Sequence, residues 1–186
     1  MKKLLLWFGL LLILSISGII SIAILTKPDE ITQSKFLAAE LVEIESLLPY
    51  RDFLSEEVSK VDVAWHMDHS LKVINEVIKY LHSTEPDEYR KEFNFIRMMV
   101  FASGRIPRGV GKAPASVLPP EEIITEDILN QLGKAELSLE SLNIAHSQSH
   151  FDHPVFGLLD LEDTKKFLEI HTNHHLAIIR DIIEGQ

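Results

Sequence analysis

The chain has 186 residues, of which 18 are basic, 28 are acidic and none is cysteine. Without cysteine, the protein forms no disulfide and carries no lipid attached at a cysteine. The acidic balance argues against nucleic acid and anionic lipid headgroups as partners, because neutralising phosphates requires clustered lysine and arginine side chains. The length predicts a single domain of modest size.

The first segment of the chain is apolar. No charged residue occurs in the stretch from Leu4 to Leu25. A helix of this length can cross a hydrocarbon core of about 30 Å, so the sequence predicts a transmembrane anchor over residues 1–26 and a linker over 27–33. A cleaved signal peptide with a small-residue site at Ser21-Ile22-Ala23 is the alternative, although the apolar stretch continues beyond that site.

The charges on either side of this segment predict its orientation. Lys2 and Lys3 precede it, whereas Asp29 and Glu30 follow it closely. Because lysine-rich flanks stay in the cytoplasm, we expect the N-terminus inside and the domain outside, in the periplasm or at the cell exterior. The protein would then be a single-pass protein of the cell membrane that meets the bilayer through its N-terminal helix.

Beyond the linker, apolar residues spaced three and four apart predict helices, and no strand of useful length is indicated. Proline and glycine are most frequent in an irregular stretch from Ser103 to Pro120. Asp160, with Asp163 three residues later, is a suitable N-cap for the last helix. The other predicted helices cover residues 36–48, 56–81, 88–102 and 122–145. We therefore expect an all-α domain over 34–186, an up-down type four-helix bundle with a long Pro/Gly-rich crossover loop.

Two histidines in the last predicted helix have the spacing of metal ligands. His171 and His175 are four residues apart, so their side chains lie on one face of a helix. The apolar residues on the same face are Phe167, Leu168, Ile178, Ile179 and Ile182. Two buried imidazoles need partners, and one shared cation would satisfy both. The alternative is that each ring has a hydrogen-bond partner and no metal binds.

A third ligand is expected from a facing helix, because two imidazoles seldom hold a transition metal alone. The second predicted helix offers His66 and His69, and periodicity slightly favours His66. His150 or His153 could supply a fourth ligand or a substrate contact, and His146 and His150 form another pair four residues apart. The structural alternative for these three is a helix-end cap at His146 and turn stabilisation at the other two.

Three short motifs occur in a characteristic order. They are Ile-Pro-Arg-Gly at 106–109, His-Pro-x-Phe-Gly at 153–157 and His-x-x-His-His-Leu at 171–176. Their order and spacing resemble the DinB-like (YfiT-like) superfamily of metal-dependent four-helix-bundle proteins, and most closely a branch of unknown function. The resemblance covers roughly residues 34–184.

In that superfamily, three histidines hold the metal. The resemblance therefore implies His171 and His175 as ligands. It also selects His69 over His66, because the stretch from Trp65 to Ser70 is similar to the family's approach to its histidine. His174 would then be an outer or surface residue.

A catalytic metal site is the functional expectation. Three imidazoles leave a coordination position open, and nitrogen donors suit zinc, nickel or ferrous iron alike. The resemblance implies a metal-dependent hydrolase or transferase, for which Glu76, two turns after His69, is a candidate base or ligand partner. The alternative is a non-catalytic, metal-stabilised bundle that binds a small molecule or a partner. The oligomeric state is left open, with a homodimer among the options.

Overall fold

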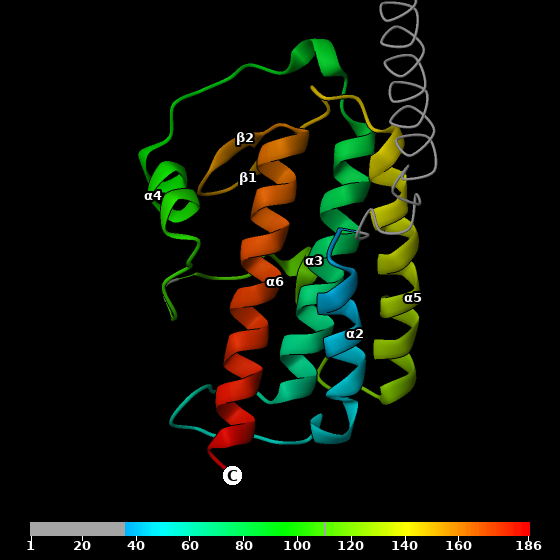
Figure 1. Cartoon of the computed structure of the whole chain (residues 1–186), viewed down its shortest axis with the longest axis vertical. Coiled ribbons are helices and arrows are strands. Elements are labelled where there is room, and N and C mark those ends of the chain that lie inside the picture. Colours follow the sequence, from blue (N-terminus) through cyan, green and yellow to red (C-terminus); the bar gives the residue numbers. More distant parts are fainter. Residues whose placement is uncertain (1–35, 110) are drawn as a thin grey trace, which may run out of the picture. The chain divides into compact units, whose positions relative to one another are not determined.

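The structure, a computed structural model, describes residues 36–109 and 111–186, which form five α-helices and one antiparallel pair of strands (Figure 1). The helices are α2 (Ala38–Ser46), α3 (Val63–Ser83), α4 (Phe95–Ser103), α5 (Thr125–Ser141) and α6 (Leu161–Glu184). The strands are β1 (Phe151–His153) and β2 (Gly157–Leu159). Four short 3-10 helices complete the described elements: η1 (Leu48–Tyr50), η2 (Pro86–Glu88), η3 (Ala115–Val117) and η4 (Leu142–Ile144).

The predicted anchor and linker, residues 1–33, lie outside the described residues. Residues from Phe36 to Gln186 form one compact unit. Among the helices that are described, none is long and apolar enough to cross a membrane. The predictions of a transmembrane anchor and of a domain outside the cytoplasm therefore stay predictions.

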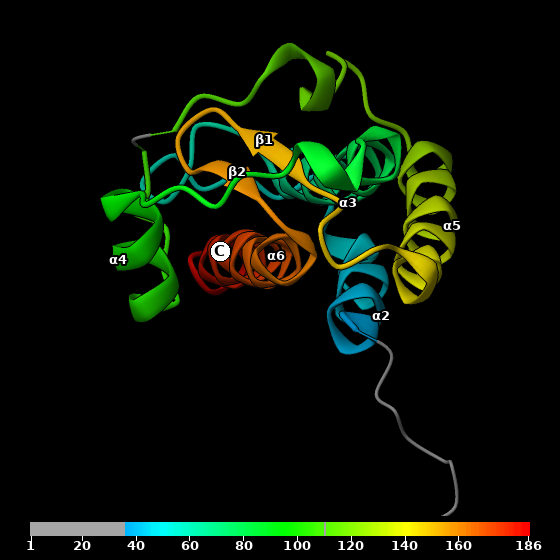
Figure 2. The same cartoon turned by 90° about the horizontal axis from the view of Figure 1, so that it is seen from above.

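Four helices, α2, α3, α5 and α6, lie side by side (Figures 1 and 2). α3 packs against α5 and α6, and α2 contacts the same two helices. α3 and α5 run in the same direction, since Asn75 bonds to Gln131 and His82 to Ser141. The expectation of a mainly helical domain is confirmed. A long crossover between α3 and α5 allows two neighbouring helices to be parallel.

The predicted apolar stripes form the core between these helices. The five apolar residues that the sequence places beside His171 and His175 on α6 are all buried. The apolar residues of α3 at helical spacing are buried as well, namely Val63, Val73, Ile74, Val77 and Leu81. α5 buries Ile128, Leu132 and Leu139, whereas Ile124, the residue before this helix, is exposed.

Side-chain caps explain where two helices begin later than the sequence predicts. α3 begins at Val63 because the Asp62 carboxylate accepts the Trp65 main-chain N–H at 2.8 Å. α4 begins at Phe95 because the Asn94 side chain accepts the Arg97 main-chain N–H at 2.9 Å. Such caps satisfy main-chain donors that a helix start leaves free.

The expectation of no strand was wrong for a short hairpin, in which β1 pairs with β2. The His153 ring holds its turn, since Nδ1 accepts the main-chain N–H groups of Val155 and Phe156 at 3.1 and 3.2 Å. Gly157 follows at a φ of 71°, a conformation that favours glycine. Strands of three residues are too short to show a period of two in the sequence.

The crossover leaves α3 after Ser83 and reaches α5 at Thr125. On its way α4 packs against α6, and η3 packs against α3 (Figure 2). The crossover therefore touches both helices that carry the candidate metal ligands.

Candidate metal centre

α6 carries two of the histidines, and it starts as the sequence predicts. Oδ1 of Asp160 accepts a hydrogen bond from the Asp163 main-chain N–H at 2.9 Å. From this cap, the helical repeat brings His171 and His175 to the side that packs against α3. His175 is buried and His171 is half-buried.

Three histidines from the two facing helices converge. One nitrogen from each of His69, His171 and His175 lies within 4.8 Å of the other two. The ring centroids are 4.9 Å apart for His69 and His175, 5.2 Å for His69 and His171, and 4.6 Å for His171 and His175. This buried cluster could hold a metal ion, whose bonds to imidazole nitrogen are about 2.0–2.1 Å, after small rotations of the rings.

The orientation of the His69 ring is set by the crossover. Its Nδ1 lies 2.9 Å from the main-chain carbonyl oxygen of Val117, in η3. Because a carbonyl only accepts, Nδ1 carries the proton and the lone pair of Nε2 is left for a metal. Trp65 stacks on the same ring, with centroids 4.8 Å apart and planes at 27°.

His66 forms a hydrogen bond with His175. Nδ1 of His66 lies 2.9 Å from Nδ1 of His175, and Nε2 of His66 lies 2.9 Å from Oγ of Ser59. In the proton arrangement compatible with metal binding at Nε2 of His175, His175 donates from Nδ1 to His66, and His66 donates from Nε2 to Ser59. Nε2 of His175 then keeps its lone pair for a metal. His66, the candidate favoured by periodicity, is therefore placed to orient a ligand.

His171 provides an independent observation in favour of a cation. Its Nδ1 is buried and has no hydrogen-bond partner among the described residues. Leaving such a group unsatisfied costs roughly 1–3 kcal/mol. A metal ion bound at this nitrogen would offset that cost, so the donor set fits a cation.

Burial keeps the cluster uncharged. It lowers the pKa of His171 and of His175 well below the ordinary 6.5, and the neighbouring imidazoles lower these pKa values further. Burial also lowers the pKa of His69, against a smaller raising effect of the Val117 hydrogen bond. The pKa of His66 falls to about 4, again mainly through burial. At neutral pH all four rings are therefore uncharged, and each has one nitrogen that can accept a hydrogen bond or bind a metal ion.

The other predicted candidates lie outside the three-histidine cluster. His146 is exposed, and its Nδ1 accepts the Gln148 main-chain N–H. His150 is buried at the turn, where its Nδ1 lies 3.2 Å from the Gln148 carbonyl oxygen. His153 uses its Nδ1 in the hairpin turn and stacks on Phe156, with centroids 4.3 Å apart. The contacts of His150 and His153 match the turn stabilisation of the structural alternative, whereas His146 bonds within the turn that follows η4 and does not cap a helix end.

His174 and Glu76 have different positions relative to the cluster. The His174 ring is 5.1 Å from that of His175, and it forms a hydrogen bond with the Ile106 main chain in the crossover. Glu76 instead forms an exposed ion pair with Lys79 at 3.1 Å. No contact of Glu76 with the cluster occurs among the described residues, so its candidacy as a base has no support.

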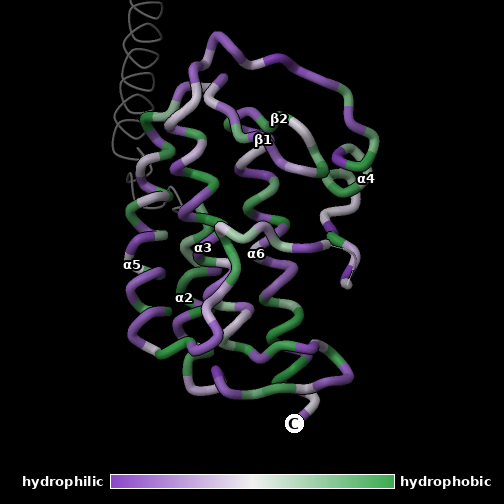
Figure 3. Tube along the Cα trace, turned by 180° about the vertical axis from the view of Figure 1, so that it is seen from behind, coloured by the Kyte–Doolittle hydropathy of each residue, from purple (hydrophilic) through white to green (hydrophobic). Residues whose placement is uncertain are grey.

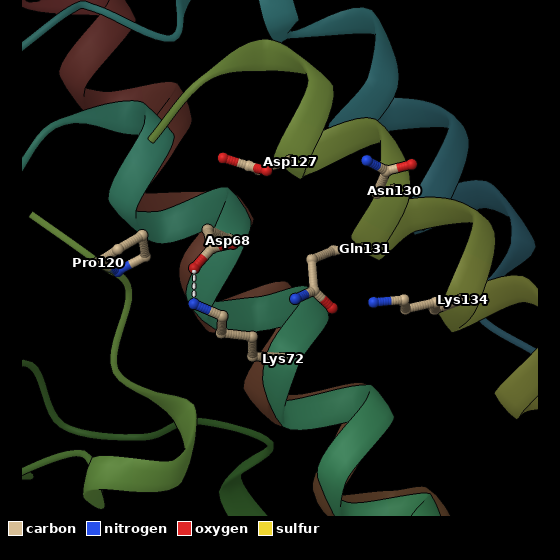
Figure 4. Close-up of a pocket in the computed structure, with 7 residues that line it drawn as sticks. All are labelled: Asp68, Lys72, Pro120, Asp127, Asn130, Gln131 and Lys134. Atoms are coloured by element: carbon tan, nitrogen blue, oxygen red, sulfur yellow. Dashed lines mark ion pairs between the residues drawn. The ribbon is translucent and has the colours of Figure 1, made fainter. Parts of the chain in front are cut away.

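A polar cleft of about 530 Å³ lies between α3, α5 and the end of the crossover (Figure 4). Its lining residues are Asp68, Lys72, Pro120, Asp127, Asn130, Gln131 and Lys134. Asp68 and Lys72 form an ion pair across 2.7 Å within it. The cleft contains none of the cluster histidines, and we treat it as separate from the metal centre.

Sequence reasoning missed three contributors to the site: the Ser59 hydroxyl, the Val117 carbonyl and the stacking face of Trp65. The first two lie outside the α-helices and are brought to the histidines only by the tertiary fold. Trp65 had a weak signal, since one helical turn separates it from His69.

Comparison with known proteins gave no match, either to a protein-family model, to a curated protein or to a solved structure. The resemblance to the DinB-like superfamily therefore stays an interpretation of the sequence motifs.

Proposed function

We propose that the domain binds a divalent transition metal through His69, His171 and His175 and acts as a metal-dependent hydrolase or transferase. The observation that carries the proposal is the convergence of three neutral imidazoles, one with an unpartnered buried nitrogen. All three donors are nitrogen, which is compatible with zinc, nickel or ferrous iron.

The protein's own residues hold and orient the donors. The Val117 carbonyl orients the ring of His69, and the hydrogen bonds between Ser59 and His66 and between His66 and His175 orient the ring of His175. Trp65 and Phe167 cover the rings of His69 and His171 from the side. When bound, an ion with an open position would lower the pKa of a water molecule and polarise a substrate oxygen.

The proposed membership in the DinB-like superfamily rests on the motifs together with the order of the helices. Support comes from four helices side by side, a crossover between two parallel ones and the origin of the histidines on α3 and α6. The proposed membrane anchor rests on the sequence from Leu4 to Leu25 alone. A C-terminal alkaline phosphatase fusion tests its orientation, and an inactive fusion would contradict a domain outside the cytoplasm.

Metal content tests the proposed site. The full chain, purified in mild detergent and incubated with zinc, nickel or ferrous iron, should retain about one ion per chain after desalting. His69→Ala, His171→Ala and His175→Ala should each lose it, whereas the exposed His146→Ala serves as the matched control. Full metal content in His69→Ala would refute the assignment.

The burial of His69 and His175 favours one second candidate, a metal that only stabilises the bundle. Substitution with cobalt(II) separates the two functions. A visible spectrum that shifts on addition of azide or acetohydroxamate indicates an open, catalytic position. A spectrum that does not respond to either ligand favours the structural role.

A further inference from the structure

α4 exposes its apolar residues to the outside of the domain. Its one charged residue, Arg97, is buried. The exposed apolar side chains are Phe95 (61%), Ile96 (53%), Met98 (45%) and Met99 (53%), with Phe93 (81%) just before the helix. A surface helix normally has the opposite arrangement, with apolar residues inward and charges outward.

Arg97 fixes α4 in this orientation. Its guanidinium donates hydrogen bonds to the main-chain carbonyls of Leu158, at 2.7 Å, and Glu92, and it faces the Asp163 carboxylate at 3.6 Å. Rolling the helix to bury its apolar face would remove the charge from these partners. The helical repeat keeps the exposed Phe95, Met98 and Met99 together on one side of the helix. Figure 3 shows apolar residues of α4 in green.

The stretch of sequence that contains this helix is basic, whereas the rest of the domain is acidic. Residues 89–112 carry six basic side chains and one acidic side chain, whereas the rest of 36–186 carries eight basic and 25 acidic side chains. Lys91, Arg105 and Lys112 are exposed and form no salt bridge among the described residues. The net charge of residues 89–112 is therefore opposite in sign to the net charge that argues against anionic lipid for the whole protein.

We propose that the outer face of α4, with Lys91, Arg105 and Lys112, docks the domain on an anionic lipid surface. Apolar side chains flanked by basic ones fit the boundary between acyl chains and anionic headgroups. We call these residues and the exposed apolar residues of α4 the α4 patch.

Charge favours lipid over a two-fold dimer through α4. In a two-fold dimer built on α4, each α4 patch would face its own copy and bring like charges together. A bilayer supplies both the apolar and the anionic component. The uncharged stretch from Leu4 to Leu25, which predicts an anchor, is consistent with a domain that works close to a bilayer.

A single-cysteine label tests the α4 patch, because the chain has no cysteine of its own. Met99→Cys, in the full chain, is labelled with an environment-sensitive fluorophore and placed in nanodiscs of zwitterionic or anionic lipid. Leu137→Cys, an exposed apolar position on α5, is the matched control. With anionic lipid, we expect emission at position 99 to shift to the blue and aqueous quenching to slow about tenfold, while position 137 is unchanged.

The charged residues have their own variant, in which Lys91, Arg105 and Lys112 are all replaced by glutamate. In this background the protection at position 99 should be lost, with an unchanged melting temperature. Equal quenching at positions 99 and 137 in anionic nanodiscs would overturn the proposal. The proposal would also be overturned if the label at position 99 is protected from aqueous quenching without lipid and the protection rises with protein concentration. That result would favour a second copy of the chain.

Discussion

The support that His66 gives to His175 predicts a graded loss of metal affinity. His66→Ala removes the group 2.9 Å from Nδ1 of His175 and leaves that buried nitrogen without a partner. An unsatisfied buried donor costs roughly 1–3 kcal/mol. Removing the partner of a metal ligand typically weakens binding about 10–100-fold, which is about 1.4–2.7 kcal/mol. The two ranges agree, so we expect a loss of that size.

A second variant at the same position separates hydrogen bonding from packing. The amide oxygen of His66→Asn lies one bond from Cγ, as Nδ1 does in histidine, so it can accept the proton of His175. We therefore expect His66→Asn to recover most of the affinity that His66→Ala loses. His82→Ala, which removes an exposed ring bonded to Ser141, is the control.

Competition with a chromophoric chelator measures these affinities in the full chain, with circular dichroism as a check on folding. If the metal dissociation constants of His66→Ala and of the unsubstituted protein differ by less than twofold, His66 does not contribute to metal binding. An affinity of His66→Asn no higher than that of His66→Ala would refute the hydrogen bond as its cause. Complete metal loss in His66→Ala, with full retention in His69→Ala, would make His66 the ligand.

Three further predictions concern stability. Burial lowers the pKa of His153 in the folded protein to about 4. As the pH falls below 6.5, this histidine is therefore protonated in the unfolded chain before it is protonated in the folded protein. His153 should therefore contribute up to about 3 kcal/mol to the stability lost between pH 6.5 and 4, in addition to the loss from the buried histidines of the cluster. Urea unfolding of His153→Asn should show a smaller loss than the unsubstituted protein by up to that amount, whereas an equal loss in both would contradict it. Asp160→Ala removes the cap of α6 and should lower the unfolding free energy by about 1 kcal/mol, with no such change in the exposed Asp152→Ala. Arg97→Met leaves buried carbonyls and Asp163 without their cation, so denaturant midpoints should report a loss of about 3 kcal/mol, against almost none for Arg105→Met.

The parts of the fold that follow from local sequence were predictable. The stripe around His171 and His175 extends over many turns, so its period is clear, and Asp160 supplies a recognisable start. The start of α3 was less predictable, because helix-compatible residues precede it and only the cap at Asp62 sets the boundary. α4 could not be oriented from its period, since the side that faces the domain is defined by a buried arginine.

The candidate site was predictable in its residues and less so in their roles. Spacing pointed to His171 and His175, and the resemblance selected His69 where periodicity favoured His66. Both residues face inward, so periodicity could not separate them. Their partners do separate them, but the carbonyl that orients His69 is 48 residues away in an irregular segment. No local pattern encodes such a contact.

The three candidate donors also connect distant parts of the chain. His69 lies on α3, and His171 and His175 lie on the last helix, about 100 residues later. One ion shared between them would close a loop of that length, and covalent cross-links over such loops stabilise a fold by up to about 5 kcal/mol through the entropy of the unfolded chain. A chain without cysteine would thereby have a reversible substitute for a disulfide, which a chelator could open without any change in redox conditions.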